Sequence, residues 1–243
     1  MQYLLLITMI LVGGPAVGEA GVPQSAASQL EIAPVVLNLD PGQVSATIEV
    51  RNQGAAPVTI QARPYDWSQA LDNDVLTPTS EIILSPPIFT VPANGVQTVR
   101  LMLRGDARSV ADQERSYRLL LDEVPTAGAG SGQVQVTLRM SLPVFAGSAQ
   151  PAPTLGWTAA RSVDGDVVLT ATNTGRGHVR VNDLQVTLAD GSHPRLTAQG
   201  KSPYVLPGAG RRWVIEGSAV ARDSPVSVRT TTQAGTSDVT LTF

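Results

Sequence analysis

Residues 133–145 of the chain read QVQVTLRMSLPVF. Apolar residues occupy every second position of this stretch, namely Val134, Val136, Leu138, Met140 and Leu142. Alternation with a period of two predicts a β-strand with one apolar and one polar face. The stretch exceeds the usual strand length of about five or six residues. Its apolar row packs either against the core of this protein or against a partner, and alternation alone does not distinguish the two.

Similar runs fill the region before this stretch and are separated by turn residues such as Asp40-Pro41-Gly42. The expected strands cover residues 30–39, 44–51, 58–67, 81–91, 96–104, 117–124 and 133–145. Pro86-Pro87 inside one run favours an edge strand or a bend between sheets. Seven short strands in this order predict an immunoglobulin-like sandwich over residues 28–146.

A second β-rich region follows the small and proline-rich stretch AGSAQPAP. We expect a linker at residues 147–153 and a second immunoglobulin-like sandwich at residues 154–243. The expected strands cover residues 167–172, 179–188, 211–216, 226–231 and 239–243. The predicted fold class is therefore all-β, with two immunoglobulin-like sandwich domains.

The chain begins with MQYLLLITMILVGGPAVGEA, an apolar run followed by small residues. This pattern predicts a signal peptide over residues 1–20, with cleavage after Ala20 and export from the cytoplasm. No Lys or Arg precedes the apolar run, which departs from the usual pattern. A membrane anchor is the alternative, but the run is shorter than the ~20 apolar residues needed to span a bilayer.

Composition excludes several kinds of protein. The chain has 243 residues, a formal net charge of −3 and no cysteine. The charge gives no reason to expect a nucleic-acid partner, and the absence of cysteine excludes disulfides, thiol chemistry and cysteine-based metal sites.

Residues that could support catalysis or metal binding are few. Neither His178 nor His193 has a nearby serine or carboxylate pattern typical of a triad or a metal cluster, so we expect both to be structural or exposed. The loop GAGSG lacks the Lys-Ser/Thr ending and the following helix of a phosphate-binding loop. Asp72 and Asp74 could bind calcium, but two acids in a polar turn usually form only a turn. We therefore expect no enzyme activity, no metal, no cofactor and no use of ATP.

Several stretches resemble a known family in order and spacing. They are APVVLNLDPGQVSATIEVRN, YDWSQ, LTPTSEIILSPPIFTVPANGVQTVRL, SYRLLLDEVP and LRMSLPVF, with looser matches at ATNTGRGHVRV and YVLPGAGRRW. Together they resemble the periplasmic pilus-assembly chaperones of the PapD-like family. The similarity is greatest to the archaic branch, which serves Csu-type and spore-coat-U-like fimbriae.

The resemblance implies two immunoglobulin-like domains in a boomerang arrangement and a location in the periplasm. It also implies donor-strand complementation, in which the chaperone adds a strand to the groove of an incomplete fimbrial subunit. The subunit is then delivered to an outer-membrane usher. The sequence leaves open whether the free chaperone masks its apolar strand by self-association. Under this reading, the row from Val134 to Leu142 fills the subunit groove.

The family holds the carboxylate at the subunit's C-terminus with two basic residues between the domains. The first expected strand has no Arg or Lys, and Val36 occupies the position where one would be expected. The resemblance therefore assigns the anchor to Arg118, which lies in an otherwise apolar strand, and to Arg139. Alternatively, each arginine is exposed or pairs with Asp122 or Glu123.

Arg100 and Glu114 match positions where the family has a structural charge pair. The main alternative for the whole chain is a secreted immunoglobulin-like structural protein, either a pilus subunit or an adhesin. Subunits carry a long donor extension before the first strand, and only a short segment separates Ala20 from the first expected strand here.

Overall fold

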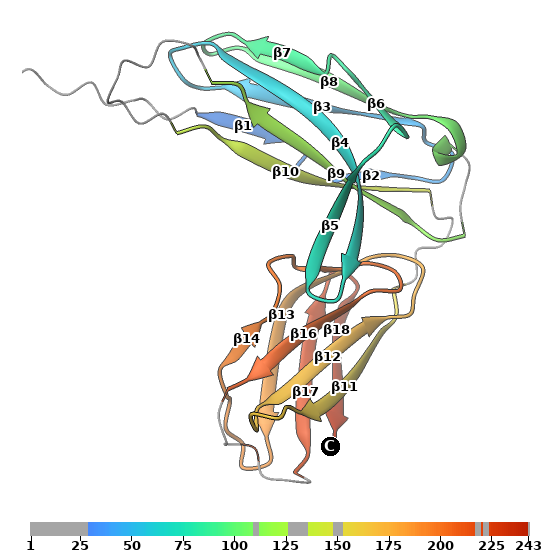
Figure 1. Ribbon diagram of the computed structural model, residues 1–243, viewed down its shortest axis with the longest axis vertical. Helices are drawn as coiled ribbons and strands as arrows, with labels where there is room; N and C mark the ends of the chain where they lie inside the picture. Colours follow the sequence, from blue (N-terminus) through green and yellow to red (C-terminus); the bar gives the residue numbers. More distant parts are fainter. Residues whose placement is uncertain are drawn as a thin grey trace, which may run out of the picture.

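The computed structural model describes residues 29–108, 112–125, 136–147, 153–216, 220 and 224–242. The expected signal peptide at residues 1–20 lies outside the described residues, as does most of the expected linker. Figure 1 shows two β-rich domains set at an angle to each other. The all-β fold class with two sandwiches is confirmed.

The first domain is a sandwich of two sheets. One sheet has the order β1-β3-β8-β6 and the other β2-β10-β9-β4-β5, with β7 also paired to β4. The strands are β1 Leu30–Ala33, β2 Leu37–Leu39, β3 Ser45–Asn52, β4 Val58–Ala70, β5 Asn73–Pro78, β6 Ile82–Ser85, β7 Ile88–Val91, β8 Val96–Leu103, β9 Arg115–Glu123 and β10 Arg139–Ala146. A short 3₁₀ helix spans Gly105–Arg108.

Two expected strands are each divided between the sheets. The run 81–91 forms β6 in one sheet and β7 in the other, which confirms the bend expected at Pro86-Pro87. The run 30–39 also divides, since β1 pairs with β3 whereas β2 pairs with β10. Pro34 lies between the two pieces and has no N–H to donate, so the ladder of β1 does not continue through it.

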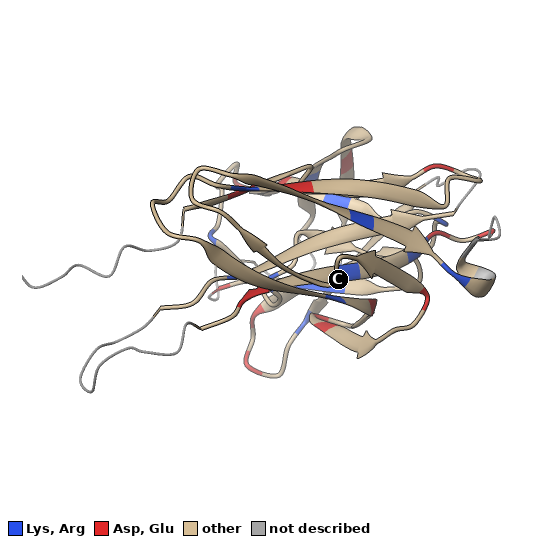
Figure 2. Ribbon diagram, turned by 90° about the horizontal axis from the view of Figure 1, so that it is seen from above, with Lys and Arg blue, Asp and Glu red and all other residues tan. Residues whose placement is uncertain are grey.

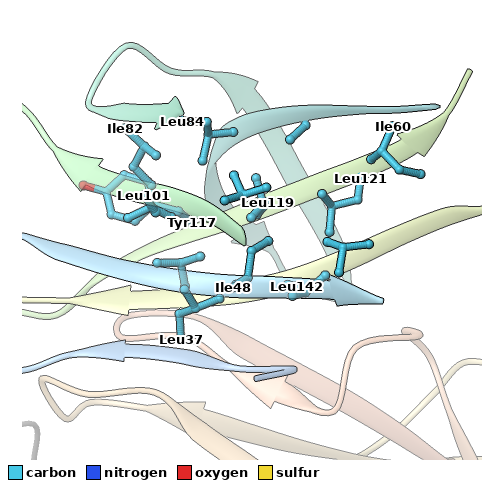
Figure 3. Packing of buried hydrophobic residues seen from close by; sticks show 14 of the residues in the cluster. Leu37, Ile48, Ile60, Ile82, Leu84, Leu101, Tyr117, Leu119, Leu121 and Leu142 are labelled. Carbon is cyan, nitrogen blue, oxygen red and sulfur yellow. The ribbon is translucent and has the colours of Figure 1, made fainter. Parts of the chain in front are cut away.

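The first domain's core fills the space between its sheets, as Figure 3 shows. Alternation in β3 directs Ile48 and Val50 inward, and both are almost fully buried. Leu119 and Leu121 of β9 meet them from the opposite sheet. Each such large apolar side chain contributes about 1.5–3 kcal/mol relative to exposure.

The second domain is a smaller sandwich with sheets ordered β11-β12-β16-β14 and β15-β13-β17-β18. Its strands are β11 Leu155–Arg161, β12 Val167–Asn173, β13 Val179–Leu188, β14 Leu196–Ala198, β15 Tyr204–Val205, β16 Gly210–Ile215, β17 Val226–Thr232 and β18 Gly235–Leu241. Alternation in β12 and β17 buries Val167, Leu169, Val226 and Val228 in a separate core.

A long hairpin of β4 and β5 crosses from the first domain to the second, where it lies beside the loops above β16 (Figure 1). At its tip, Asp72 accepts hydrogen bonds from the Arg212 backbone N–H at 2.8 Å and from Arg212 Nε at 2.7 Å. Asp72 Cα, C and O also lie close to Gly200, so a side chain there would collide with the hairpin. Asp72 thus joins the tip of the first domain's hairpin directly to the second domain.

Charged residues of both signs are interspersed over the described chain, as Figure 2 shows. No helix in the described part of the chain is long and apolar enough to cross a membrane. Within the same residues, no group of three His, Asp or Glu side chains has an arrangement suited to a metal ion.

Candidate functional site

The edge of β10 is only partly covered. On one side, β10 pairs with β9 along its whole length, from Arg139 opposite Asp122 to Ala146 opposite Arg115. On the other side, β2 pairs only with residues 144–146 of β10. Residues 139–143 therefore have no neighbouring strand on that side within the described chain, and such an edge can accept an added strand.

The direction of the backbone groups follows from the β9 ladder. Leu138 O accepts from Glu123 N at 2.9 Å, so the backbone of Leu138 faces β9. Backbone groups alternate between the two sides of an antiparallel strand, and those of Arg139 and Ser141 therefore face the open side. The backbone of Pro143 also faces the open side, so the absence of an N–H at Pro143 costs no hydrogen bond to β9.

The predicted apolar row divides along its length. Val136 is 75% exposed and Leu138 is 38% exposed, whereas Met140 is half-buried against the first domain's core. Leu142 is only 5% exposed and lies within that core beside Leu119 and Leu121 (Figure 3). The assignment of Leu142 to a partner's groove is therefore corrected, because its side chain already fills this protein's own core. Val134 lies outside the described residues.

The long strand expected at residues 133–145 is also shorter in the structure, since β10 begins at Arg139. Residues 136–138 precede β10 and do not belong to a regular strand. The exposed part of the row is thus the segment that leads into β10 along its open edge.

Arg118 lies at the junction of the two domains. Its side chain is 11% exposed, and its guanidinium lies 3.7 Å from the Trp67 ring centre and 5.7 Å from that of Tyr204 in the second domain. Burial lowers the pKa of Arg118, and Asp74 partly offsets this effect. An arginine keeps its charge even so, so Arg118 is a buried cation.

The carboxylate nearest to Arg118 is a weak partner. Asp74 Oδ2 lies 3.8 Å from Arg118 Nη2, at the outer limit of an ion pair. Its other oxygen, Oδ1, accepts a hydrogen bond from Gln69 at 2.9 Å. Gln69 also donates to the Tyr204 carbonyl and accepts from the Leu206 N–H, which ties the hairpin to the second domain. Among the described residues, this 3.8 Å contact is the ion pair that Arg118 makes.

Arg139 lies elsewhere. Its side chain is 65% exposed and pairs with Asp122, to which Arg63 also donates. Burial would raise the pKa of Asp122, but the hydrogen bonds from Arg63 and Arg139 outweigh it, and the pKa is lowered. Arg118 lies opposite Pro143, four residues along β10 from Arg139, or roughly 13 Å. The structure does not bring the two predicted anchor residues together, and Arg139 forms the alternative pair with Asp122.

The predicted pair of Arg100 and Glu114 does not form among the described residues. Arg100 is exposed on β8 and donates to Ser45 Oγ at 3.3 Å. Glu114 precedes β9, and its carboxylate accepts from the His178 backbone N–H at 3.0 Å and contacts His178 Nδ1 at 2.8 Å. Arg100 and Glu114 therefore have different partners. Similarity of short sequence motifs does not show which residues are in contact.

An aromatic cluster fills the domain junction. Trp67, Phe145, Tyr204, Leu206 and Ala209 are buried together, and Val36 packs against them. His178, which the sequence analysis treated as structural or exposed, stacks on Phe145 with ring centres 3.6 Å apart. His193 lies in an exposed turn and contacts the Val186 carbonyl. Val36 has an apolar neighbourhood, consistent with the absence of a basic residue at that position.

Sequence reasoning did not identify the contact between Asp72 and Arg212. The predicted polar turn is confirmed for Asp72, which lies between β4 and β5, whereas Asp74 belongs to β5, a strand that the sequence did not predict. The residues of β5 are all exposed, so no apolar alternation marks this strand. Asp72 holds the tip of the hairpin against the second domain, and Asp74 lies near Arg118 of the first domain.

The fold and the site together define a class: a two-domain immunoglobulin-like protein with an open-edged strand and a buried cation at the domain junction. Residues 29–151 match the family of pili and flagellar-assembly chaperones, in its PapD N-terminal domain. This match covers more than half of the chain, and the chain belongs to that family.

A curated relative is the chaperone protein FimB/FhaD of Bordetella pertussis, which is 29% identical over 133 residues. The match covers 52% of this chain and 53% of that relative, so the chain spans about half the length of the relative it matches.

Solved structures are similar over most of the chain. A chain of the CsuC-CsuE chaperone-tip adhesion subunit pre-assembly complex from the archaic Csu pili of Acinetobacter baumannii has a TM-score of 0.65. It is 22% identical, and the match covers 88% of this chain and 98% of that one. The Salmonella enterica SafA pilin in complex with the SafB chaperone gives a TM-score of 0.60 at 17% identity, covering 88% of this chain and 96% of that one. Similarity at these identities is similarity of fold.

Proposed function

We propose that this protein is a periplasmic chaperone that binds fimbrial subunits by donor-strand complementation and delivers them to an outer-membrane usher. The observation that carries the proposal is the open edge of β10 at residues 139–143, next to the exposed apolar side chains of Val136 and Leu138. Two solved structures with a similar fold contain partners of this kind. One is the SafA pilin in complex with the SafB chaperone, and the other is the CsuC-CsuE chaperone-tip adhesion subunit pre-assembly complex. The CsuC-CsuE similarity also supports placement in the archaic branch.

An incomplete subunit exposes an apolar groove beside unpaired backbone groups, and such a surface aggregates. The open edge supplies backbone groups for the missing ladder, and the alternate apolar side chains of the segment leading into it enter the groove. The proposed groove residues are Val134, Val136, Leu138 and Met140. Burial of three or four such side chains contributes on the order of 5–10 kcal/mol before the costs of ordering and association.

Arg118 is proposed as the anchor for the carboxylate at the subunit's C-terminus. Its buried guanidinium can bind a carboxylate through two parallel hydrogen bonds. Its long contact with Asp74 is weaker than such a pair. A carboxylate held at the domain junction would fix the register of the added strand along β10.

The proposal is tested by co-expressing the chaperone with each small secreted β protein that the neighbouring reading frames encode and purifying it from the periplasm. We expect wild type to recover a subunit and Leu138→Asp to lose it, because the aspartate would be buried in an apolar groove. Ser141→Pro should also weaken recovery, because it removes an N–H that faces the open edge without breaking the β9 ladder.

Ile88→Asp is the matched control, because Ile88 is also exposed and apolar but lies on β7, away from β10. Circular dichroism verifies that each variant is folded. Equal subunit recovery with Leu138→Asp and Ile88→Asp would contradict a groove-filling role for the row. Failure of wild type to recover any neighbouring subunit would contradict the chaperone function.

A further inference from the structure

A buried arginine in the second domain lacks the partners that its charge requires. Arg211 of β16 is 8% exposed, and its Nη2 donates to the Gly200 carbonyl at 2.7 Å. Its Nε and Nη1 have no hydrogen-bond partner among the described residues. The guanidinium also lies 5.3 Å from the Trp213 ring centre. A buried cation with two unpaired donors is costly and favours an anionic acceptor.

The nearby carboxylates are committed to other residues. Asp72 is hydrogen-bonded to Arg212, and Asp74 accepts from Gln69. Burial lowers the pKa of Arg211, and the charges of Asp74 and Asp72 only partly offset this effect. They act on Arg211 without a hydrogen bond, so its donors stay open to an added acceptor.

Arg211 lines a cavity of about 320 Å³ between β13, β14 and β16. The register of β13 shifts between Val181 and Asp183 beside this cavity, as it does at a β-bulge, and bulges commonly lie next to functional sites. Lys201 also lines the cavity and is the single lysine in the 243 residues. One carboxylate, that of Asp183, is present and accepts a hydrogen bond from Gln185. The cavity therefore combines two cations with one carboxylate that already has a donor.

We propose that this cavity binds a small oxyanion, either a carboxylate or a phosphate group. The unpaired Nε and Nη1 of Arg211 would donate to the oxygens of the anion, and Lys201 supplies a second positive charge from the exposed rim. The site lies within the second domain and is independent of the open edge of β10. It would give the second domain a ligand of its own, whether a free anion or the carboxylate of a partner protein.

The single lysine supplies a direct assay. In protein labelled with ¹⁵N-lysine, the Lys201 backbone amide gives the one lysine signal, which is followed as sodium phosphate or sodium acetate replaces sodium chloride at constant ionic strength. We expect a saturable shift with either oxyanion. Arg211→Gln should weaken the affinity about tenfold or more, because it removes a charged hydrogen-bonding group. Arg195→Gln, at an exposed arginine just before β14, is the matched control and should leave the affinity unchanged.

If Arg211→Gln does not fold, Lys201→Gln decides the question by calorimetry with phosphate, since Lys201 is exposed and its loss leaves the core intact. Several-fold weaker binding supports the site, and unchanged binding overturns it. A peptide with a free C-terminal carboxylate and its amidated form distinguish the sources. Binding of the free form alone identifies a partner's carboxylate, and binding of phosphate without either peptide identifies a free anion. Shifts that grow linearly without saturation, or that persist in Arg211→Gln, overturn the proposal.

Discussion

Replacing Arg118 with alanine should separate the anchor from the rest of the binding surface. The change removes a side chain that is 11% exposed and whose guanidinium lies over Trp67, and among the described residues its one ion pair is the long Asp74 contact. Loss of one partner from a buried, hydrogen-bonded charge pair typically costs about 2–5 kcal/mol of binding free energy. That range corresponds to a dissociation constant about 30-fold to several thousand-fold higher. Arg139→Ala should change it less than about fivefold, because exposed ion pairs contribute roughly 0–1 kcal/mol.

The assay is the dissociation of purified complexes of the chaperone with its subunit, with an unlabelled wild-type chaperone added in excess to capture released subunit. The subunit lacking its last residues is a further control, since it should dissociate equally from wild type and Arg118→Ala. If Arg118→Ala and Arg139→Ala weakened binding to the same extent, the reasoning from burial would be refuted. Equal, undiminished binding by both would place the carboxylate away from Arg118.

Three further predictions concern the chain on its own. Leu142→Ala should lower the free energy of unfolding, measured in urea, by about 2–5 kcal/mol because it leaves a cavity in the core. Val136→Ala, at a 75% exposed position, should change it little. Equal effects would contradict the division of the apolar row into buried and exposed residues. Burial raises the pKa of the Tyr117 hydroxyl, so its stabilising contribution is complete below the unfolded pKa near 10 and declines at higher pH. Tyr117→Phe should therefore make the free energy of unfolding fall less steeply at alkaline pH. An unchanged decline would mean that other groups cause it. Asp72→Ala removes the buried carboxylate that binds Arg212 and should broaden the range of domain angles seen by small-angle scattering. An unchanged scattering profile would contradict this role.

Much of the fold could be predicted because alternation reports directly on burial in a sandwich. The strands containing Ile48, Leu101 and Leu119 were all expected from their period of two, and their inward residues form the core. Pro86-Pro87 identified one passage between sheets because proline cannot donate to a ladder. Pro34 marks a similar passage, but a single proline near the start of a run is also compatible with an uninterrupted edge strand.

The site was less predictable, because it depends on register between strands far apart in sequence. Arg139 lies opposite Asp122 and not near Arg118, and only the pairing of β9 with β10 determines this. Leu142 and Leu138 share one face in any extended chain, yet Leu142 is buried in the core and Leu138 is exposed. Strand β5 has no apolar periodicity from which it could be predicted, and it is specified by its pairing with β4.

The β4–β5 hairpin acts as a fixed-length strut between the domains. It is anchored by Asp72 at one end of the junction, whereas the chain crosses between domains once more at residues 147–153. Because the hairpin tip is bonded to Arg212 of the second domain, we expect the angle between the sandwiches to depend on the number of residues in the hairpin. Adding one residue to β4 and one to β5 should change the orientation of the second domain without changing the packing of either core or the open edge of β10.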